Sequence, residues 1–264
     1  RKNFVCNYLS DLKGVKGFIY KNYCLGGSKN QIEPRQYFSD ENGMRCDAIR
    51  QKIENWKEQN LISDDEYYFL ITSLVESIDK YANTASVYGA FLKKLKKTAQ
   101  NNLILKPAEL IINDQDHEVF NEDINMVAGK IKGDILYLDP PYNQRQYATN
   151  YHMLETIAKY DNPEIHGKTG LREYQNQKSL YCSRTQVKKA FKDLILKARA
   201  KYIFLSYNNE GLMTLDDIQE IMSLRGKYGN FTKEYNRFKA DKSENRNYTA
   251  NKTVEYLHYV VCNN

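Results

Sequence analysis

The sequence lacks every cysteine spacing that holds zinc. Its 264 residues contain five cysteines, with no Cys-x-x-Cys pair and no cysteine–histidine cluster. They stand far apart, at Cys6, Cys24, Cys46, Cys182 and Cys262. Structural zinc sites need closely spaced ligand pairs. We therefore expect free thiols in a reducing compartment and no metal site.

Long apolar runs are also missing. No stretch approaches the roughly 18 apolar residues that cross a bilayer. The first residues do not combine a charged start with an apolar core, so they do not read as a signal peptide. The sequence therefore predicts a cytoplasmic protein without a membrane partner.

A strong charge bias is absent as well. The 39 Lys and Arg residues exceed the 33 Asp and Glu residues only slightly, for a net charge of +6. This excess is a weak indication of a polyanionic partner. Tyrosine, in contrast, is abundant, with 22 residues. Tyrosines among lysines and asparagines suit a nucleic-acid surface, because rings stack on bases while cations meet phosphates. An AT-rich genome would give the same composition, and both explanations stay open.

The patterns that are present divide the chain at about residue 117. Residues 1–117 show apolar residues at 3–4 spacing, which predicts mainly helices. Ser63 and Glu66 form a capping-box pattern at the start of one of them. A further helix is expected from about 87 to 99. The helix before the capping box should present one apolar face, made of Ala48, Ile49, Ile53 and Trp56.

Residues 118–264 alternate between apolar runs and amphipathic stretches, which predicts an α/β fold with a parallel sheet and helices on its faces. Strands are expected near 118–121, 134–138 and 201–206, and helices near 150–160, 185–199 and 214–224. The end of the chain differs. Residues 231–238 and 253–261 predict a terminal antiparallel hairpin.

Four consecutive residues, Asp139-Pro140-Pro141-Tyr142, carry the clearest chemical signal. They follow the apolar run 134–138, so we expect a buried strand that ends in a rigid turn. Each proline fixes its own φ, and the residue before it is pushed to an extended conformation. The carboxylate of Asp139 and the ring of Tyr142 should point outward from this stiff main chain. The arrangement suits a flat base with an exocyclic amine, which the ring can stack on and the Asp139 carboxylate and Pro140 carbonyl can bind.

This motif and its flanks resemble the N(6)-adenine-specific DNA methyltransferases over nearly the whole chain. The resemblance is carried by Asn121-Glu122-Asp123, by the segment from Gly133 to Tyr142, by Arg145-Gln146-Tyr147 with Asn150-Tyr151-His152, by the strand from Lys201 to Tyr207, and upstream by Arg35-Gln36-Tyr37-Phe38 and the segment from Ala82 to Lys93. An isolated Asp-Pro-Pro-Tyr would be a moderate signal. The flanking motifs in the same order make it specific.

The resemblance implies a partial Rossmann-like, S-adenosylmethionine-dependent methyltransferase domain at residues 118–264, and a helical DNA-recognition region at residues 1–117. It also implies the reaction. A methyl group would pass from S-adenosylmethionine to the 6-amino group of an adenine flipped out of double-stranded DNA. Such an enzyme would be the modification half of a restriction–modification system, with a restriction endonuclease as a partner.

The same resemblance assigns roles to residues around the motif. The catalytic residues would be Asp139, Pro140 and Tyr142, and the substrate-binding residues Pro141, Asn143 and Tyr147. Asp123, Ile124 and Asp139 would contact the cofactor, with Asp123 accepting a hydrogen bond from its adenine amine. From the residues alone, Asp123 fits a helix N-cap nearly as well.

Basic residues in three segments are candidates for contacts with DNA. The first is the helix expected at 87–99, and the second is the long connection at 161–184, which fits a DNA-contacting flap or a variable surface loop equally well. The third joins the two strands of the terminal hairpin. The candidates are Lys93, Lys94, Lys96, Lys97, Lys168, Arg172, Lys239, Lys242 and Arg246. A solvated surface is the alternative for each.

One part of the family pattern is missing. The family carries a glycine-rich strand–turn, Phe-x-Gly-x-Gly, that cradles the methionine part of S-adenosylmethionine, followed by an acidic residue that binds the ribose. Neither occurs in this sequence, and the cluster Gly26-Gly27 reads as a simple loop. The missing motifs would lie upstream of Arg1, which predicts an N-terminal truncation or, less simply, a split enzyme. We then expect the 264-residue chain alone not to bind S-adenosylmethionine usefully.

Two other functions remain open at this point. The Pro-Pro-Tyr scaffold also serves methylation of RNA or of the exocyclic amine of cytosine. A catalytically silent DNA-binding remnant would explain the missing cradle, although the intact Asp139–Tyr142 segment argues against it. A glycine-rich motif directly upstream in the reading frame would distinguish an enzyme from a remnant.

Overall fold

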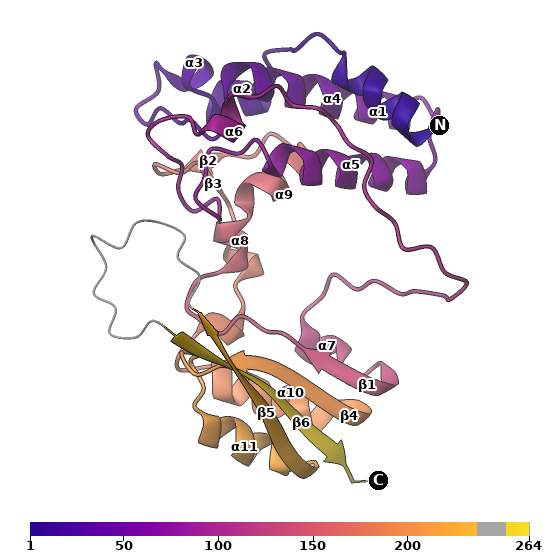
Figure 1. Ribbon diagram of the computed structural model, residues 1–264, viewed down its shortest axis with the longest axis vertical. Helices are drawn as coiled ribbons and strands as arrows, with labels where there is room; N and C mark the ends of the chain where they lie inside the picture. Colours follow the sequence, from indigo (N-terminus) through magenta and orange to yellow (C-terminus); the bar gives the residue numbers. More distant parts are fainter. Residues whose placement is uncertain (237–251, 264) are drawn as a thin grey trace. The chain divides into compact units, whose positions relative to one another are not determined.

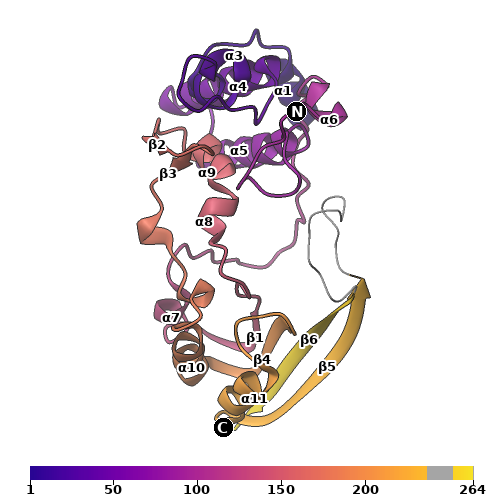
Figure 2. The ribbon, with the colours of Figure 1, turned by 90° about the vertical axis from the view of Figure 1, so that its left-hand side faces the viewer.

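The computed structural model of the chain describes residues 1–236 and 252–263, and it separates into two compact units (Figures 1 and 2). The helical unit consists of Arg1–Asn113 and Ala148–Gln175, and the sheet unit of Asp114–Tyr147 and Asn176–Asn264. The chain first passes from the helical unit to the sheet unit between Asn113 and Asp114, close to the boundary expected at residue 117. The return of residues 148–175 to the helical unit has no signal in the sequence. None of the helices described is long and apolar enough to cross a membrane.

The helical unit is built around two long helices whose ends follow from local sequence. Helix α4 begins where the Ser39 side chain accepts a hydrogen bond from the Asn42 amide, and α5 begins at the predicted capping box of Ser63 and Glu66. The predicted apolar face of α4 is confirmed, with Ile49 and Ile53 fully buried and Trp56 partly buried against the same core. The helices are α1 (Lys2–Ser10), α2 (Phe18–Tyr23), α3 (Leu25–Ser28), α4 (Asp40–Glu58), α5 (Asp64–Asp79), α6 (Lys97–Gln100), α8 (Tyr147–Asn150) and α9 (His152–Lys159).

The helix predicted at 87–99 is wrong, because only α6 forms there. The Asn83 side chain forms hydrogen bonds with main-chain groups of this segment instead. Its amide nitrogen donates to the Leu92 carbonyl at 2.9 Å, and its oxygen accepts from the Lys96 amide at 3.0 Å. Tyr88 is buried, and its hydroxyl donates to Asp79 at 2.6 Å. These long-range bonds satisfy groups that a helix would have paired internally, so tertiary contacts override the local periodicity.

Residues 148–175 are held in the helical unit by buried polar groups. Arg50, almost fully buried on α4, donates to the carbonyls of Ile157 and Ala158 at 3.1 Å each, in the last turn of α9. The hydroxyl of Tyr160 donates to Asp47 at 2.6 Å. A cation at a helix C-terminus satisfies carbonyls that have no partner within the helix. The segment is therefore docked by charge and hydrogen bonding as well as by apolar packing.

The predicted flap at 161–184 is partly ordered as a small hairpin, β2 (Ile165–His166) with β3 (Leu171–Arg172). Gly167 and Gly170 adopt φ of 66° and 68° in its turn, which glycine allows without strain. The buried Arg35 donates to the carbonyls of Gly167 at 2.8 Å and Lys168 at 3.2 Å. The turn is thus fixed on the helical unit. The rest of the connection contains the 3₁₀ turns η1 (Gln175–Gln177) and η2 (Leu180–Cys182).

The sheet unit confirms the predicted α/β class with a mixed sheet in the order β1-β4-β6-β5 (Figure 1). Strands β1 and β4 are parallel, and β6 runs antiparallel to both β4 and β5. The strands are β1 (Lys132–Leu138), β4 (Arg199–Asn208), β5 (Gly226–Asn236) and β6 (Lys252–Cys262), and the helices are α7 (Ile124–Val127), α10 (Val187–Lys197) and α11 (Leu215–Ser223). The predicted strands near 134–138 and 201–206 and the helices near 185–199 and 214–224 are confirmed. The two hairpin strands are confirmed within the described residues, which end at 236 in the first of them.

Two details of the predicted sheet are wrong. Residues 118–121 form no strand, and Val119 is 94% exposed. A short apolar run becomes a strand only when another strand pairs with it, and the described residues offer none here. Strand β1 is also not buried on both sides. Leu138 is buried against α10 and α11, whereas Ile135 and Tyr137 on the other face are 64% and 59% exposed.

Two buried histidines make the stability of the chain sensitive to acid. Burial lowers the pKa of His152, in the helical unit, from 6.5 to about 4, and does the same for His258, in the sheet unit. Between pH 6.5 and pH 4, these two histidines are therefore protonated in the unfolded chain but neutral in the folded units. Each histidine should contribute up to about 3 kcal/mol at pH 7, and this contribution is lost as the pH falls from 6.5 to 4.

Urea unfolding at pH 7 and pH 5, together with NMR titration of the histidine rings, checks this expectation. A titration of either buried ring near pH 6.5 in the folded protein would contradict it.

Candidate active site

The Asp139–Tyr142 segment lies at the carboxyl edge of the parallel pair of strands in the sheet unit. Leu138, the last residue of β1, is paired in register with Leu205 of β4. The segments that follow both strands therefore emerge at the same edge. In open α/β sheets, ligands bind at the carboxyl ends of the strands, because loops diverge there and leave room. This is where the sequence places Asp139, and where β4 delivers Ser206 to Asn208.

Asp139 is exposed at this edge, as predicted, but Tyr142 is half-buried. Its ring packs against that of Tyr207 on β4, with centroids 6.1 Å apart and planes at 81°. Burial raises the pKa of the Tyr142 hydroxyl, and the nearby carboxylates of Glu255 and Asp139 raise it further. The expectation of a freely exposed ring is therefore wrong. A ring held on one side by the core still offers its remaining surface to a ligand.

The loop after the motif is fastened to the segment around η2, also within the sheet unit. Asn143 accepts a hydrogen bond from the Arg145 amide at 2.9 Å, which makes a tight turn after Tyr142. The Gln146 side chain donates to the Ser179 carbonyl at 3.2 Å and accepts from the Ser179 amide at 2.8 Å. This two-bond clamp fixes the residue directly before the exposed Tyr147, where α8 begins. The sequence assigns Gln146 no role of its own, because a long-range clamp leaves no local pattern.

Asp123 takes the helix-cap position that the sequence left open. Its Oδ1 accepts from the Asn125 amide at 2.8 Å at the start of α7. Asn125 in turn donates to the Ala190 carbonyl and to Asp193, at 2.8 Å each, and so ties α7 to α10. Asp123 and Ile124 are both exposed. A cap uses one carboxylate oxygen, and it fixes the direction in which an exposed Asp123 can meet a ligand.

The described residues fit only part of a nucleoside cofactor. Asp123, Ile124 and Asp139 could meet an adenine and its ribose, but no glycine-rich strand–turn occurs in residues 1–236 or 252–263. Gly26 and Gly27 lie in α3, where a Cβ would overlap Asp40 and the Tyr20 carbonyl, so these glycines serve helix packing. A cradle for the methionine part is therefore not formed by these residues.

The predicted DNA-contacting residues differ in exposure and in the hydrogen bonds that they already form. Lys93, Lys94, Lys97 and Lys168 are exposed. Lys96 donates its ammonium group to the Thr84 carbonyl at 3.1 Å. Arg172 is buried and forms two hydrogen bonds with Asp161, at 3.1 and 2.6 Å. This ion pair is structural, so we no longer count Arg172 among the candidates for DNA contact. The candidates in the hairpin connection, Lys239, Lys242 and Arg246, lie outside the described residues.

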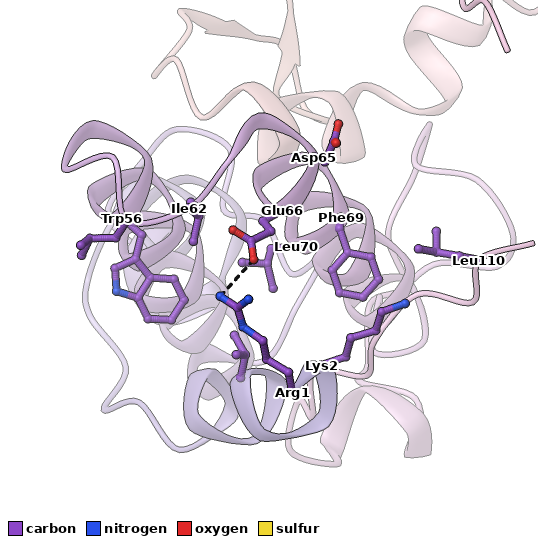
Figure 3. A pocket seen from close by; sticks show the side chains of 11 residues that line it. Arg1, Lys2, Trp56, Ile62, Asp65, Glu66, Phe69, Leu70 and Leu110 are labelled. Carbon is purple, nitrogen blue, oxygen red and sulfur yellow. Dashed lines mark ion pairs between the residues drawn. The ribbon is translucent and has the colours of Figure 1, made fainter. Parts of the chain in front are cut away.

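Among the described residues, the candidate site includes neither a metal-binding group nor the cavity in the helical unit. In the described residues, no group of three or more His, Cys, Asp or Glu side chains is placed to hold a metal ion. A cavity of about 490 Å³ lies entirely within the helical unit (Figure 3). Its lining is apolar, with Trp56 and Phe69 among its walls, and an ion pair of Arg1 with Glu66 at 3.1 Å crosses it. None of the residues predicted for catalysis or for cofactor binding lines it.

The Asp139–Tyr142 segment at the end of a parallel strand, on a mixed sheet with helices, is consistent with a methyltransferase of exocyclic amines. Comparison with known proteins specifies this class. Residues 4–221 match the family described as D12 class N6 adenine-specific DNA methyltransferase, and the chain belongs to that family. The fold described above is consistent with it, and the family's enzymes are transferases.

Individual relatives agree with the family match. The chain is 54% identical to the type II methyltransferase M.NlaIII of Neisseria lactamica over 250 residues, which cover 95% of this chain and 73% of that protein. It is 41% identical to the type II methyltransferase M.FokI of Planomicrobium okeanokoites, over 86% of this chain but 35% of that protein. It is 38% identical to M.CviAII of Paramecium bursaria Chlorella virus 1, over 93% and 70% of the two chains. No solved structure gives a significant match.

Proposed function

We propose that this chain performs the methylation step of a DNA adenine methyltransferase, with S-adenosylmethionine as the methyl donor and a flipped adenine in duplex DNA as the acceptor. One observation carries the proposal. A carboxylate, a prolyl carbonyl and a half-buried aromatic ring follow one another on a stiff turn, at the strand edge where α/β enzymes bind ligands. Family membership and the relatives' names support the same chemistry.

The difficulty of the reaction lies in the nucleophile. The lone pair of adenine's amine is delocalised into the ring, so the amine attacks poorly. Hydrogen bonds from its two N–H groups to the Asp139 carboxylate and the Pro140 carbonyl would hold the nitrogen in a pyramidal form with a localised lone pair. Both acceptors sit on a main chain that the prolines restrict, so they keep the amine aligned without reorganisation during the reaction. Asp139 would also take up the proton as the new bond forms.

Tyr142 would bind the base itself. Extruding a base from the duplex costs a few kcal/mol, and stacking on an aromatic ring returns about 1–3 kcal/mol. Because one side of the Tyr142 ring is packed against Tyr207, its orientation is set before the base arrives. Asn143 and Tyr147, which follow on the clamped loop, and Pro141 would complete the base contacts.

The methyl donor supplies an electrophilic methyl group on a charged sulfur. In this chain, Asp123 and Ile124 would hold the donor's adenine end, and Asp139 would contact the donor as well as the base. We also propose that the enzyme modifies DNA in the cytoplasm as part of a restriction–modification system, because the relatives are named as type II methyltransferases.

The direct test is methylation of a mixed-sequence duplex with tritiated S-adenosylmethionine, followed by digestion and identification of the labelled nucleoside. We expect the label in N6-methyladenine. An active preparation that labels only cytosine, or RNA but not the duplex, would contradict the proposed substrate. The preparation should contain residues 1–264 within a protein that shows activity.

We further propose that Lys93, Lys94 and Lys97 contact DNA phosphates. Replacing all three with alanine should raise the dissociation constant for any duplex. It should also flatten the dependence of log affinity on log salt concentration, by about 0.9 for each phosphate that the protein no longer neutralises. Fluorescence anisotropy across a salt series measures both effects. The same prediction applies to Lys239, Lys242 and Arg246.

A matched control removes the same charge elsewhere. Lys188, Lys189 and Lys192 are exposed on α10 of the sheet unit, and we assign them no contact with DNA. Their triple alanine variant should keep the parental salt slope. Equal slopes for all three variants would remove the 93–97 segment and the hairpin connection from the DNA surface.

A further inference from the structure

Tyr207 is a residue to which neither the family match nor the proposed function assigns a role. It lies near the end of β4, its side chain is almost completely buried, and its ring packs edge to face against Tyr142. A T-shaped pair of this kind stabilises one relative orientation of the two rings. The contact therefore restricts the ring that is proposed to stack on the extruded base.

The hydroxyl of Tyr207 acts on the loop that follows β4. It accepts hydrogen bonds from the amides of Leu212 and Met213, at 3.1 and 3.3 Å. The same Leu212 amide also donates to the main-chain carbonyl of Tyr142 at 3.0 Å. One amide is thus shared between the Tyr207 hydroxyl and the backbone of Tyr142. The hydroxyl fixes the loop, and the loop fixes the main chain that carries the stacking ring.

Gly211 permits this arrangement. A Cβ at position 211 would overlap the Tyr207 ring, so a side chain there would have to displace the ring. The Gly211 amide also donates to the Asn208 carbonyl at 3.2 Å, which closes the turn directly after β4. Close approach of backbone to ring, with no Cβ between them, brings the Leu212 and Met213 amides to the hydroxyl.

We propose that Tyr207, seated against Gly211, is a positioning residue that sets the orientation of Tyr142 for capture of the flipped base. It acts on Tyr142 in two ways. Its ring restricts the orientation of the Tyr142 ring, and its hydroxyl restricts the position of the Tyr142 main chain through the Leu212 amide. The inference rests on the proposed function, because it assumes that Tyr142 stacks on an extruded base.

The first test is Tyr207→Phe, which keeps the ring and removes the acceptor. A duplex with 2-aminopurine at the target position reports base extrusion by its fluorescence. We expect the extruded fraction and kcat to fall about tenfold, because the buried Met213 amide loses its acceptor and the loop that carries Leu212 is held less firmly. The dissociation constant for the duplex should stay within about twofold. Gly211→Ala should give the same pattern by displacing the ring. Parental extrusion and kcat in both variants would overturn the proposal.

A structural role alone would not produce this separation. Tyr228→Phe is the matched control, since it removes another hydroxyl from the sheet unit, one that is bonded to His258 at 2.8 Å and not to the loop after β4. It should leave extrusion unchanged. If Tyr228→Phe lowers extrusion as much as Tyr207→Phe, a general loss of stability explains the effect and the proposal fails.

A double-mutant cycle shows whether Tyr207 acts through Tyr142. In the Tyr142→Ala background, Tyr207→Phe should have no further effect on extrusion, because the ring that it positions is gone. Additive effects would overturn the proposal. The positioning role and the proposed function fail differently. Parental extrusion in Tyr142→Ala would contradict the proposed function, whereas a strong effect of Tyr142→Ala with none of Tyr207→Phe would contradict only the positioning role.

Discussion

Replacing Asp139 with alanine should abolish methyl transfer, with residual activity below a few per cent, while the duplex still binds within roughly tenfold of the parental affinity. The carboxylate is exposed at the strand edge, and in the proposed function it acts on the amine as its charge develops, not on phosphates. Its loss therefore removes stabilisation of the transition state and leaves the DNA contacts in place. Transfer of tritium from S-adenosylmethionine to a duplex, together with fluorescence anisotropy for binding, separates the two quantities.

Asp134 provides a control on the same strand. It is an exposed carboxylate of β1, paired with Lys201 at 2.7 Å, and we assign it no contact with the base. Asp134→Ala should retain activity close to the parental level. Asp139→Asn adds a test of charge, since it keeps one acceptor oxygen but not the negative charge, and it should also be severely impaired. Activity above a few per cent in Asp139→Ala would remove the assignment of Asp139 as the group that binds the amine.

Replacing Tyr142 with alanine should have the second largest effect, on capture of the flipped base. Stacking is worth about 1–3 kcal/mol per base, so the extruded fraction should fall about 5- to 150-fold. Tyr142→Phe and Tyr142→Trp should largely preserve capture, because stacking requires the face of a ring and not a hydroxyl. The fluorescence of a 2-aminopurine duplex measures the extruded fraction, and tritium transfer measures the rate.

Burial must be separated from stacking in this experiment. Tyr142 is half-buried in the core of the sheet unit, so Tyr142→Ala also removes packing against Tyr207. A thermal melt of each variant shows the cost in stability, and Tyr142→Leu offers an apolar side chain without a ring face. If Phe impaired capture as much as Ala, or if Leu preserved it, the stacking role would be wrong.

The sequence by itself determined the chemistry of the candidate site. Asp139-Pro140-Pro141-Tyr142 is contiguous, so its stiffness and its donor and acceptor groups follow from local covalent geometry. The same holds for the capping box of Ser63 and Glu66 and for the apolar face of α4, because caps and amphipathic faces are local properties. These elements appear in the structure where the sequence predicts them.

Only the tertiary structure decided which residues support that chemistry. Hydrogen bonds of Asn83 with Leu92 and Lys96 hold a segment that the sequence predicts as a helix. Arg172, which we expected to contact DNA, is instead paired with Asp161. Tyr207 reaches Tyr142 from a strand far along the chain, through an amide that the two residues share. Such bonds join residues that are distant in sequence, and each partner alone has an ordinary local pattern. A single sequence therefore records the groups that we propose to react, while folding selects the groups that hold them in place.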